Sequence, residues 1–271
     1  MTEFSLAGCL ALVEGDSLFT LLPPPGEDGI ENRSPCNVEI GDTGVMYIDF
    51  HTHTTRGSAD SNLDPFALID QSQKIGLHGV CITEHDNAWK DPKITEYAQE
   101  RGVTLFLGIE VTTEWGHVGA FGLDQYVGGI YKVKELRRVI NDVGGFLIAN
   151  HPFRYKLDPR FQFIHKTPPI DVNDPVSGTK ALEVLQYVDA IEIVNGACSE
   201  QENLYAHAVA QQMGVKGLGG SDSHSAQSLG CAVTILERSV STVHELLAEL
   251  KAGRFSAGQG LNVGQMRAFP D

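Results

Sequence analysis

Short apolar runs alternate with stretches of helical periodicity from residue 45 onward, and this alternation restricts the fold more than any other feature of the sequence. Helix starts are marked clearly, as where Asp64 can cap a helix whose first position is a proline. The predicted strands are residues 45–49, 79–83, 103–108, 117–123, 146–150, 190–194, 215–220 and 231–236. The predicted helices are residues 64–75, 92–101, 133–143, 177–187, 200–213 and 242–251.

Strands that alternate with helices predict an α/β protein with a mostly parallel sheet. Seven or eight such units favour closure of the sheet into a TIM-like barrel, and a chain of 271 residues suits one barrel of about 250 residues. An open doubly wound sheet is the alternative. A barrel makes a testable demand, because the functional side chains of such barrels lie at the carboxyl ends of the strands.

The first 44 residues differ from the rest of the chain. They hold eight acidic residues and one basic residue, and they include a Pro-Pro-Pro-Gly stretch. We predict an acidic N-terminal extension over residues 1–44, with a small hairpin at residues 10–22, and a main domain over residues 45–271. Disorder in part of the extension is the competing interpretation. The N-terminus lacks the basic region of a signal peptide, and no apolar run is long enough to cross a bilayer.

The formal net charge of −15 argues against a long nucleic-acid duplex as a partner, because duplex binding needs clustered lysine and arginine. A small phosphorylated substrate is compatible with this charge, since bound cations reverse the local field. The five cysteines show no CxxC spacing, which favours reduced thiols in a cytoplasmic protein over a disulfide framework. The sequence predicts no membrane partner and indicates no oligomeric state.

Histidines and carboxylates lie at the ends of the predicted strands, where the functional side chains of a barrel are expected. Six of the ten histidines are found at predicted strand ends, two of them in an HxH pair directly after the first strand. Alternate residues of an extended chain point the same way, so both imidazoles of that pair face one side. The side chains at strand ends are His51, His53, His85, Glu110, His117 (which begins the fourth strand), His151, Asp222 and His224.

These residue types together point to a metal centre. Imidazole and carboxylate ligands suit Zn²⁺, Mn²⁺ and Fe²⁺. The set is larger than one ion can use, so the sequence predicts two to three divalent metal ions per chain. A carboxylate such as that of Glu110 can bridge two ions, and ions bridged in this way suit phosphoryl-transfer chemistry. The other four histidines have no such partners in the sequence, and we expect them to be ordinary helix or surface residues; they are His78, His165, His207 and His244.

Seven segments, taken in order, resemble the motif series of the PHP (polymerase and histidinol phosphatase) family. They are IDFHTHT, ITEHD, GIEVT, GHVGAFGL, ANHPF, IEIVNG and GGSDSHS, and the resemblance covers residues 47–255. The resemblance implies a distorted (β/α)7 TIM-like barrel, a trinuclear metal site and phosphoesterase activity.

The resemblance also implies how the ligands divide among three ions. The first ion would take His51, His53, Glu110 and Asp222. The second would share Glu110 and add His117 and His151. The third would take His85, His224 and one residue from the loop after the HxH pair.

That loop departs from the pattern usual in the family. The usual pattern is HxHSxxSDG, and its aspartate falls on Ser58 here. The nearest carboxylate is Asp60, and we expect a slightly longer loop to bring it in as the third-site ligand. Glu84 stands where aspartate is usual, which we expect to matter little because the neighbouring His85 is the ligand.

Substrate contacts are predicted from position. Arg154 follows His151 by three residues, and arginine is a natural bidentate partner of phosphate. Arg56 is a weaker candidate, and Asn195 closes the sixth strand and is expected to line the pocket. With Glu110, Asp222 and His224 as catalytic residues, we predict metal-dependent hydrolysis of a small phosphate ester, with a phosphomonoester favoured over a diester.

Three alternatives stay open. An amidohydrolase-like enzyme that cleaves C–N bonds would share the HxH pair, but such barrels generally bridge their metals with a lysine, and no lysine ends a predicted strand. A phosphodiesterase or exonuclease that trims short oligonucleotides is disfavoured by the acidic charge. A non-catalytic, metal-stabilised PHP module would be marked by missing ligands, whereas eight of the nine are plainly present.

Overall fold

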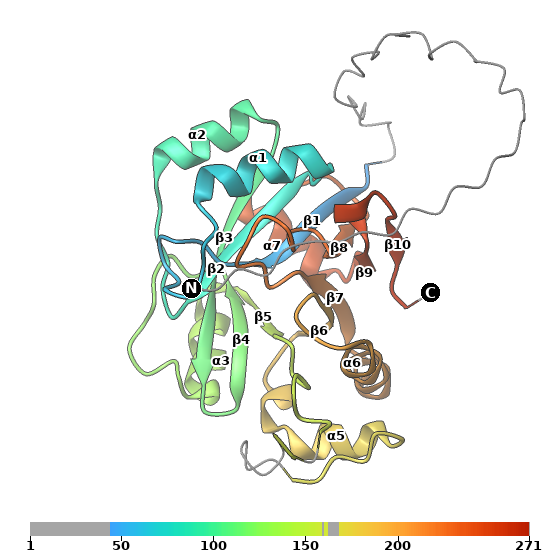
Figure 1. Ribbon diagram of the computed structural model, residues 1–271. Coiled ribbons are helices and arrows are strands. Elements are labelled where there is room, and N and C mark those ends of the chain that lie inside the picture. Colours follow the sequence, from blue (N-terminus) through green and yellow to red (C-terminus); the bar gives the residue numbers. More distant parts are fainter. Residues whose placement is uncertain (1–43, 159, 162–167, 271) are drawn as a thin grey trace, which may run out of the picture. The chain divides into compact units, whose positions relative to one another are not determined.

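The structure is a computed structural model that describes residues 44–158, 160–161 and 168–270 (Figure 1). These residues belong to one compact unit, Val38–Asp271. The predicted acidic extension and its hairpin lie outside the described residues, apart from Gly44, and so does His165. Within the described part of the chain, no helix has the length and apolar character needed to span a membrane. Its cysteines, at positions 81, 198 and 231, are free thiols.

One ten-stranded sheet forms the frame of this unit. Its strands are Met46–Thr52 (β1), Gly79–His85 (β2), Thr104–Thr113 (β3), Gly116–Phe121 (β4), Phe146–Ala149 (β5), Ala190–Asn195 (β6), Lys216–Gly220 (β7), Ala232–Leu236 (β8), Phe255–Gln259 (β9) and Arg267–Ala268 (β10). They lie in the order β10-β9-β8-β1-β2-β3-β4-β5-β6-β7. Parallel pairing joins β1, β2 and β3, and also β5, β6 and β7. The other pairs are antiparallel.

The helices are Pro65–Ile75 (α1), Pro92–Glu100 (α2), Val133–Val143 (α3), Pro175–Ala181 (α5), Glu200–Met213 (α6) and Val243–Lys251 (α7), with short 3-10 helices at Glu183–Gln186 (η1) and Leu261–Val263 (η2). Side chains cap the starts of these α-helices except α3, which begins after Lys132 without a side-chain cap. The Asp64 carboxylate accepts the backbone N–H groups of Phe66 and Ala67 at the start of α1. The single helix predicted at 177–187 is instead α5 followed by η1, because the extended backbone of Leu182 interrupts it.

The sheet curls around one apolar cluster, to which every strand from β1 to β9 contributes and which α7 also joins. The curl brings distant strands together. The His53 N–H donates to the Ser223 carbonyl at 2.9 Å, and the Ser223 N–H donates to the His51 carbonyl at 3.3 Å. The end of β1 therefore meets the segment after β7, although the two strands are far apart in the sheet order. The sheet is barrel-like, and the open doubly wound alternative does not describe it.

Helices cover the outside of this curled sheet in two groups. Leu68 of α1 and Ala98 of α2 share a cluster with Val80 of β2 and Val233 of β8. The helices α3, α5 and α6, with η1, share another cluster with β3 to β6, and Figure 1 shows α1 and α2 well separated from α5 and α6. The expected α/β architecture is thus present, with an inner core and outer helices.

The fourth strand runs against its neighbours, which corrects the prediction of a mostly parallel sheet. β3 turns into β4 within two residues, Glu114 and Trp115, so no helix separates the two strands. The antiparallel strands β4, β8, β9 and β10 do not fit a regular series of seven β/α units, so the predicted (β/α)7 count is not confirmed. The strands β9 and β10 were not predicted. The reversal has a functional consequence, because the start of an antiparallel β4 lies at the same edge as the ends of β3 and β5.

His78 precedes β2 and is not the ordinary surface residue expected. Its Nδ1 accepts the Tyr47 backbone N–H at 2.9 Å, which requires a neutral ring. Burial lowers the pKa of His78 below the ordinary value of 6.5. As pH falls through 6.5, His78 is protonated in the unfolded chain before it is protonated in the folded protein. The stability that His78 contributes is therefore present above pH 6.5 and declines as pH falls below it.

We predict that His78→Ala lowers the free energy of unfolding by about 1–3 kcal/mol at pH 8, because it leaves the Tyr47 N–H without its acceptor. The difference from wild type should shrink at pH 5.5. Urea unfolding at both pH values, with constant EDTA, measures this. His244→Ala, which removes an exposed histidine, is the control. A difference that is equal at both pH values, or larger in acid, would contradict the assignment.

Candidate metal centre

One edge of the curled sheet gathers the histidines and carboxylates that the sequence singled out. Their potential ligand atoms form four overlapping groups of three, and within each group the atoms lie within 4.8 Å of one another. The groups are His53, His85 and His224; His51, Glu110 and His151; His51, His53 and Asp222; and His85, Glu110 and His117. The residues come from the ends of β1, β2, β5 and β7, from within β3 and from the start of β4.

The fully buried carboxylate of Glu110 lies at the middle of this cluster. Its Oε1 has three imidazole nitrogens at 3.1–3.2 Å, and its Oε2 has two at 3.0 and 3.4 Å. Those around Oε1 belong to His51, His117 and His151, and those around Oε2 to His53 and His85. The Asn150 amide also donates to Oε1, at 3.0 Å. The two oxygens thus divide the imidazoles into two sets.

Asp222 supplies a second buried carboxylate. Its Oδ1 lies 3.4 Å from His53 Nε2 and 3.6 Å from His51 Nε2, and its Oδ2 accepts from Arg154 at 2.8 Å. The backbone of Asp222 has φ +56°, and that of His151 has φ +29°. Residues other than glycine rarely adopt such angles, which cost about 1–3 kcal/mol and cluster at functional sites.

Acceptors outside the cluster fix two of the rings. His51 Nδ1 lies 3.1 Å from Oε1 of the buried Glu192, and His224 Nδ1 lies 2.9 Å from the Asp222 carbonyl oxygen. Each acceptor takes a ring N–H, so Nε2 is left to present a lone pair to the cluster. This is how proteins orient histidines that bind metal.

His51 Nε2 lies only 3.0 Å from His53 Nε2. Two lone pairs at this distance repel each other unless a proton or a metal cation holds them together. Two nitrogens bound to one zinc ion at about 2.0–2.1 Å each are about 3.3 Å apart in tetrahedral geometry. The observed separation therefore fits two ligands of one ion.

The charges of the cluster are strongly coupled. Burial alone would lower the pKa of His51, but the Glu110 and Asp222 carboxylates outweigh burial and raise it well above 6.5. Burial lowers the pKa of His53. Burial alone would raise the pKa of Glu110, but the charge of His51 holds it well below the usual range. The hydrogen bond to Glu110 also raises the pKa of His85 above 6.5. Without metal, His51 and His85 therefore hold protons more strongly than an ordinary imidazole does.

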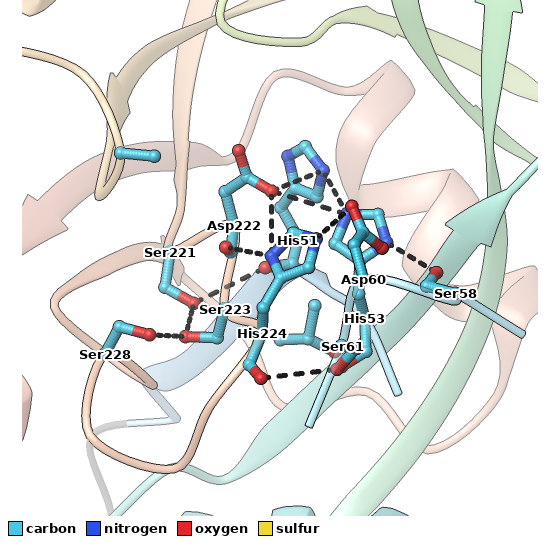
Figure 2. Close-up of polar contacts among 12 residues, drawn as sticks. His51, His53, Ser58, Asp60, Ser61, Ser221, Asp222, Ser223, His224 and Ser228 are labelled. Carbon is cyan, nitrogen blue, oxygen red and sulfur yellow. Dashed lines mark hydrogen bonds and ion pairs between the residues drawn. The ribbon is translucent and has the colours of Figure 1, made fainter. Parts of the chain in front are cut away.

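Asp60 lies beside the third group. Its Oδ2 is 3.4 Å from His224 Nε2 and 3.5 Å from His85 Nε2, and its side chain is 60% exposed. Figure 2 shows the Asp60 and Asp222 carboxylates beside the rings of His51, His53 and His224. The loop that carries Asp60 is fastened to the opposite segment, because the Asn62 N–H donates to the His224 carbonyl at 3.0 Å.

The donor set fits divalent metal. Nitrogen and oxygen donors converge from several directions, as Zn²⁺, Mn²⁺ and Fe²⁺ require. Oε2 of Glu110 accepts no hydrogen bond of good geometry from the described residues although it is fully buried. A buried acceptor without a partner is costly, and a cation would satisfy it.

A cavity of about 600 Å³ opens above the cluster. Its walls include Arg154 and Lys156 with two aromatic residues, Trp115 and Tyr155, whose side chains are partly exposed. Nε of Arg154 is buried and has no hydrogen-bond partner among the described residues. A cation with a spare donor at the wall of a metal-lined cavity suits an anionic ligand.

The other two predicted substrate residues lie elsewhere. Arg56 pairs with Asp91 at 2.6 Å and stacks on Trp89, and it does not line the cavity. Asn195 is buried behind His51, where its amide donates to Glu192 at 2.9 Å and accepts the Ala197 N–H at 2.8 Å. Its polar atoms are thereby engaged within the protein.

Sequence reasoning missed several residues that support the cluster. Glu192, which holds the His51 ring and accepts the His151 N–H at 2.7 Å, stands inside the apolar strand AIEIVN. A lone glutamate within a buried strand was the available signal. Lys156, Trp115 and Tyr155 gave no signal, because they reach the cavity from loops.

The comparisons with known proteins agree with this arrangement. The fold and the site together describe an α/β protein whose curled sheet gathers histidines and carboxylates at one edge. Residues 49–155 match the PHP domain, and residues 200–255 match the PHP-associated family. The chain therefore carries a PHP domain followed by a PHP-associated segment.

Individual relatives are distant. An error-prone DNA polymerase of Nocardia farcinica is 26% identical over 25% of this chain, and the match spans only 6% of the polymerase. The uncharacterised protein MJ1587 of Methanocaldococcus jannaschii is 26% identical over 40% of this chain and 68% of its own length. The crystal structure of PsfC from Pseudomonas syringae is 19% identical and covers 76% of this chain and 88% of PsfC, with a TM-score of 0.51, which shows a shared fold.

We predict that binding of Zn²⁺ or Mn²⁺ at pH 7 releases protons, because a histidine must be deprotonated to bind metal and the raised pKa of His51 keeps it protonated without metal. Metal affinity should accordingly fall as pH falls. Calorimetric titration in two buffers of different ionisation enthalpy counts the protons. Tight binding with no proton release between pH 6 and 7 would contradict this picture of the cluster.

Proposed function

We propose that this protein is a metal-dependent phosphoesterase that hydrolyses a small phosphate ester with two to three divalent ions. One observation carries the proposal: a fully buried carboxylate, Glu110, stands among five imidazoles with nitrogens at 3.0–3.4 Å. Such a grouping is costly without cations and well suited to bridge two of them. The PHP domain match and the cavity above the cluster add support.

The distances favour the predicted division of ligands. His51, His53 and Asp222 would hold the first ion, and His117 and His151 the second, with Glu110 shared. His85, His224 and Asp60 would hold the third. His85 also lies beside Oε2 of Glu110, so the third group adjoins the bridging carboxylate.

The residues around the cavity would bind and orient the substrate. Divalent ions held here supply a nucleophile from water at neutral pH and neutralise phosphoryl charge. Arg154 would bind a phosphoryl oxygen with its free Nε–H, while its other end stays paired with Asp222. Glu192 and Asn150 would keep His51 and Glu110 in place. No serine or cysteine nucleophile is needed.

A phosphomonoester remains the favoured substrate, because the chain is acidic and only the metal-lined cavity would attract anions. The second candidate is a phosphodiester in a short oligonucleotide. The match to a DNA polymerase favours this candidate, although it covers a small part of that protein. A panel of sugar phosphates, nucleoside bisphosphates and short oligonucleotides, assayed with Mn²⁺, Zn²⁺ and Fe²⁺, separates the two.

Glu110→Ala should lower kcat by about 10³-fold or more, the equivalent of about 4 kcal/mol, because it removes a ligand shared by two ions. Arg154→Ala should lower kcat/KM by only about 10–100-fold, because it removes one charged contact. Steady-state kinetics at matched metal loading measures both. Arg138→Ala, which removes an exposed arginine on α3, is the control. Near-native kcat in Glu110→Ala would overturn the bridging role.

Asp60→Ala should lower the metal content at saturation by about one ion per chain, because Asp60 is the carboxylate beside His85 and His224. Ser58→Ala should leave the number of ions unchanged. Elemental analysis of protein saturated with Mn²⁺ and freed of excess metal gives both values. The opposite pattern would show that Ser58, and not Asp60, completes the third group.

A further inference from the structure

The two positions that depart from the usual family pattern, Ser58 and Glu84, contact each other. The Ser58 hydroxyl donates to Oε2 of Glu84 at 2.6 Å. On its other side, Ser58 Oγ lies 3.0 Å from His53 Nδ1. Both side chains are buried, at 2% and 1% exposure. A chain of hydrogen bonds therefore runs from the metal centre through a serine to a buried carboxylate.

Four hydrogen-bond donors among the described residues surround the Glu84 carboxylate. It accepts the Thr54 backbone N–H at 3.1 Å, the Thr54 hydroxyl and the Trp89 indole N–H at 2.8 Å, in addition to Ser58. Space for the long glutamate exists only because residue 57 is glycine, since a Cβ there would lie 2.4 Å from Cγ of Glu84. The carboxylate is thus held as an acceptor in a fixed place.

This arrangement decides the proton positions on Ser58 and His53. The single hydroxyl proton of Ser58 is used toward Glu84, so its oxygen can only accept from the ring of His53. The same oxygen receives the His85 backbone N–H at 3.4 Å. His53 must then carry its proton on Nδ1 and present a bare Nε2 to Glu110 and Asp222.

We propose that Ser58 and Glu84 are positioning residues that hold His53 in the Nδ1–H tautomer and so set the metal affinity of the cluster. The proposal rests on the metal centre of the proposed function. It explains why the two departures occur together. The longer Glu84 reaches the serine, and an acidic side chain at position 58 would place two carboxylates in contact. The third-site carboxylate then comes from Asp60, two residues further along the loop.

The tautomer is tested directly, in metal-free protein, by the ¹⁵N chemical shifts of the His53 ring. Wild type should show one Nδ1–H tautomer. Ser58→Ala should show a mixture, because the ring has lost its acceptor, and Ser58→Thr should restore the single form. Ser72→Ala, which removes a buried hydroxyl that donates to the Leu68 carbonyl, should leave the His53 signals unchanged. A pure Nδ1–H tautomer in Ser58→Ala would overturn the proposal.

Metal affinity, measured by competition with a chelator, is the second readout. Ser58→Ala should bind Zn²⁺ about 10–100-fold more weakly than wild type, with the same number of ions at saturation. Ser58→Asp should weaken binding further, and adding Glu84→Gln to it should recover affinity by relieving the contact between two carboxylates. A Zn²⁺ affinity of Ser58→Ala within twofold of wild type would contradict the proposed positioning of His53 by Ser58 and Glu84. Absence of metal binding in wild type would instead refute the proposed function. The tautomer experiment, which uses metal-free protein, would still test whether Ser58 and Glu84 position His53.

Discussion

The burial of the Glu110 carboxylate among imidazoles is the interaction on which the rest of the site depends. A carboxylate with no solvent exposure is costly unless positive charge or hydrogen bonds compensate it. Here the compensation comes from imidazoles on or just after four different strands, β1, β2, β4 and β5, and all of them except His117 are distant from Glu110 in the sequence. The imidazoles therefore reach Glu110 only when β1 to β5 have paired into one sheet.

The reversed direction of β4 is what completes this compensation. In a run of parallel strands, His117 would lie at the opposite edge from Glu110, because it begins its strand. The tight turn at Glu114 and Trp115 reverses the chain and returns His117 to within 3.1 Å of the carboxylate. On the far side, the backbone bonds between the end of β1 and Ser223 bring Asp222 and His224 to the HxH pair. The reversed β4 and the contact between the end of β1 and Ser223 thus bring the side chains of the cluster together.

Much of this could be predicted from the sequence, and the failures have physical causes. Strand ends and most helix starts follow from local patterns, so β1, α1 and α3 were predicted, and the eight strand-end side chains that the sequence singled out lie close together in the structure. The direction of β4 depends on the two-residue turn Glu114-Trp115, which is followed by Gly116 at φ +121° but is not one of the residue pairs typical of a hairpin turn. The positions of Arg56 and Asn195 depend on partners distant in sequence, Asp91 and Glu192, that periodicity cannot pair. Glu84 looked like a minor variation because its contact with Ser58 exists only after folding.

The metal content of protein purified without chelator or added metal tests the central claim most directly. Elemental analysis, normalised to the concentration of folded chain, should find two to three equivalents of Zn, Mn and Fe in total. Removal of these ions should lower the melting temperature, and their return should restore it, because cations bound only by the folded state stabilise it. Native protein without these metals, and with a melting temperature that does not respond to adding them, would contradict the account.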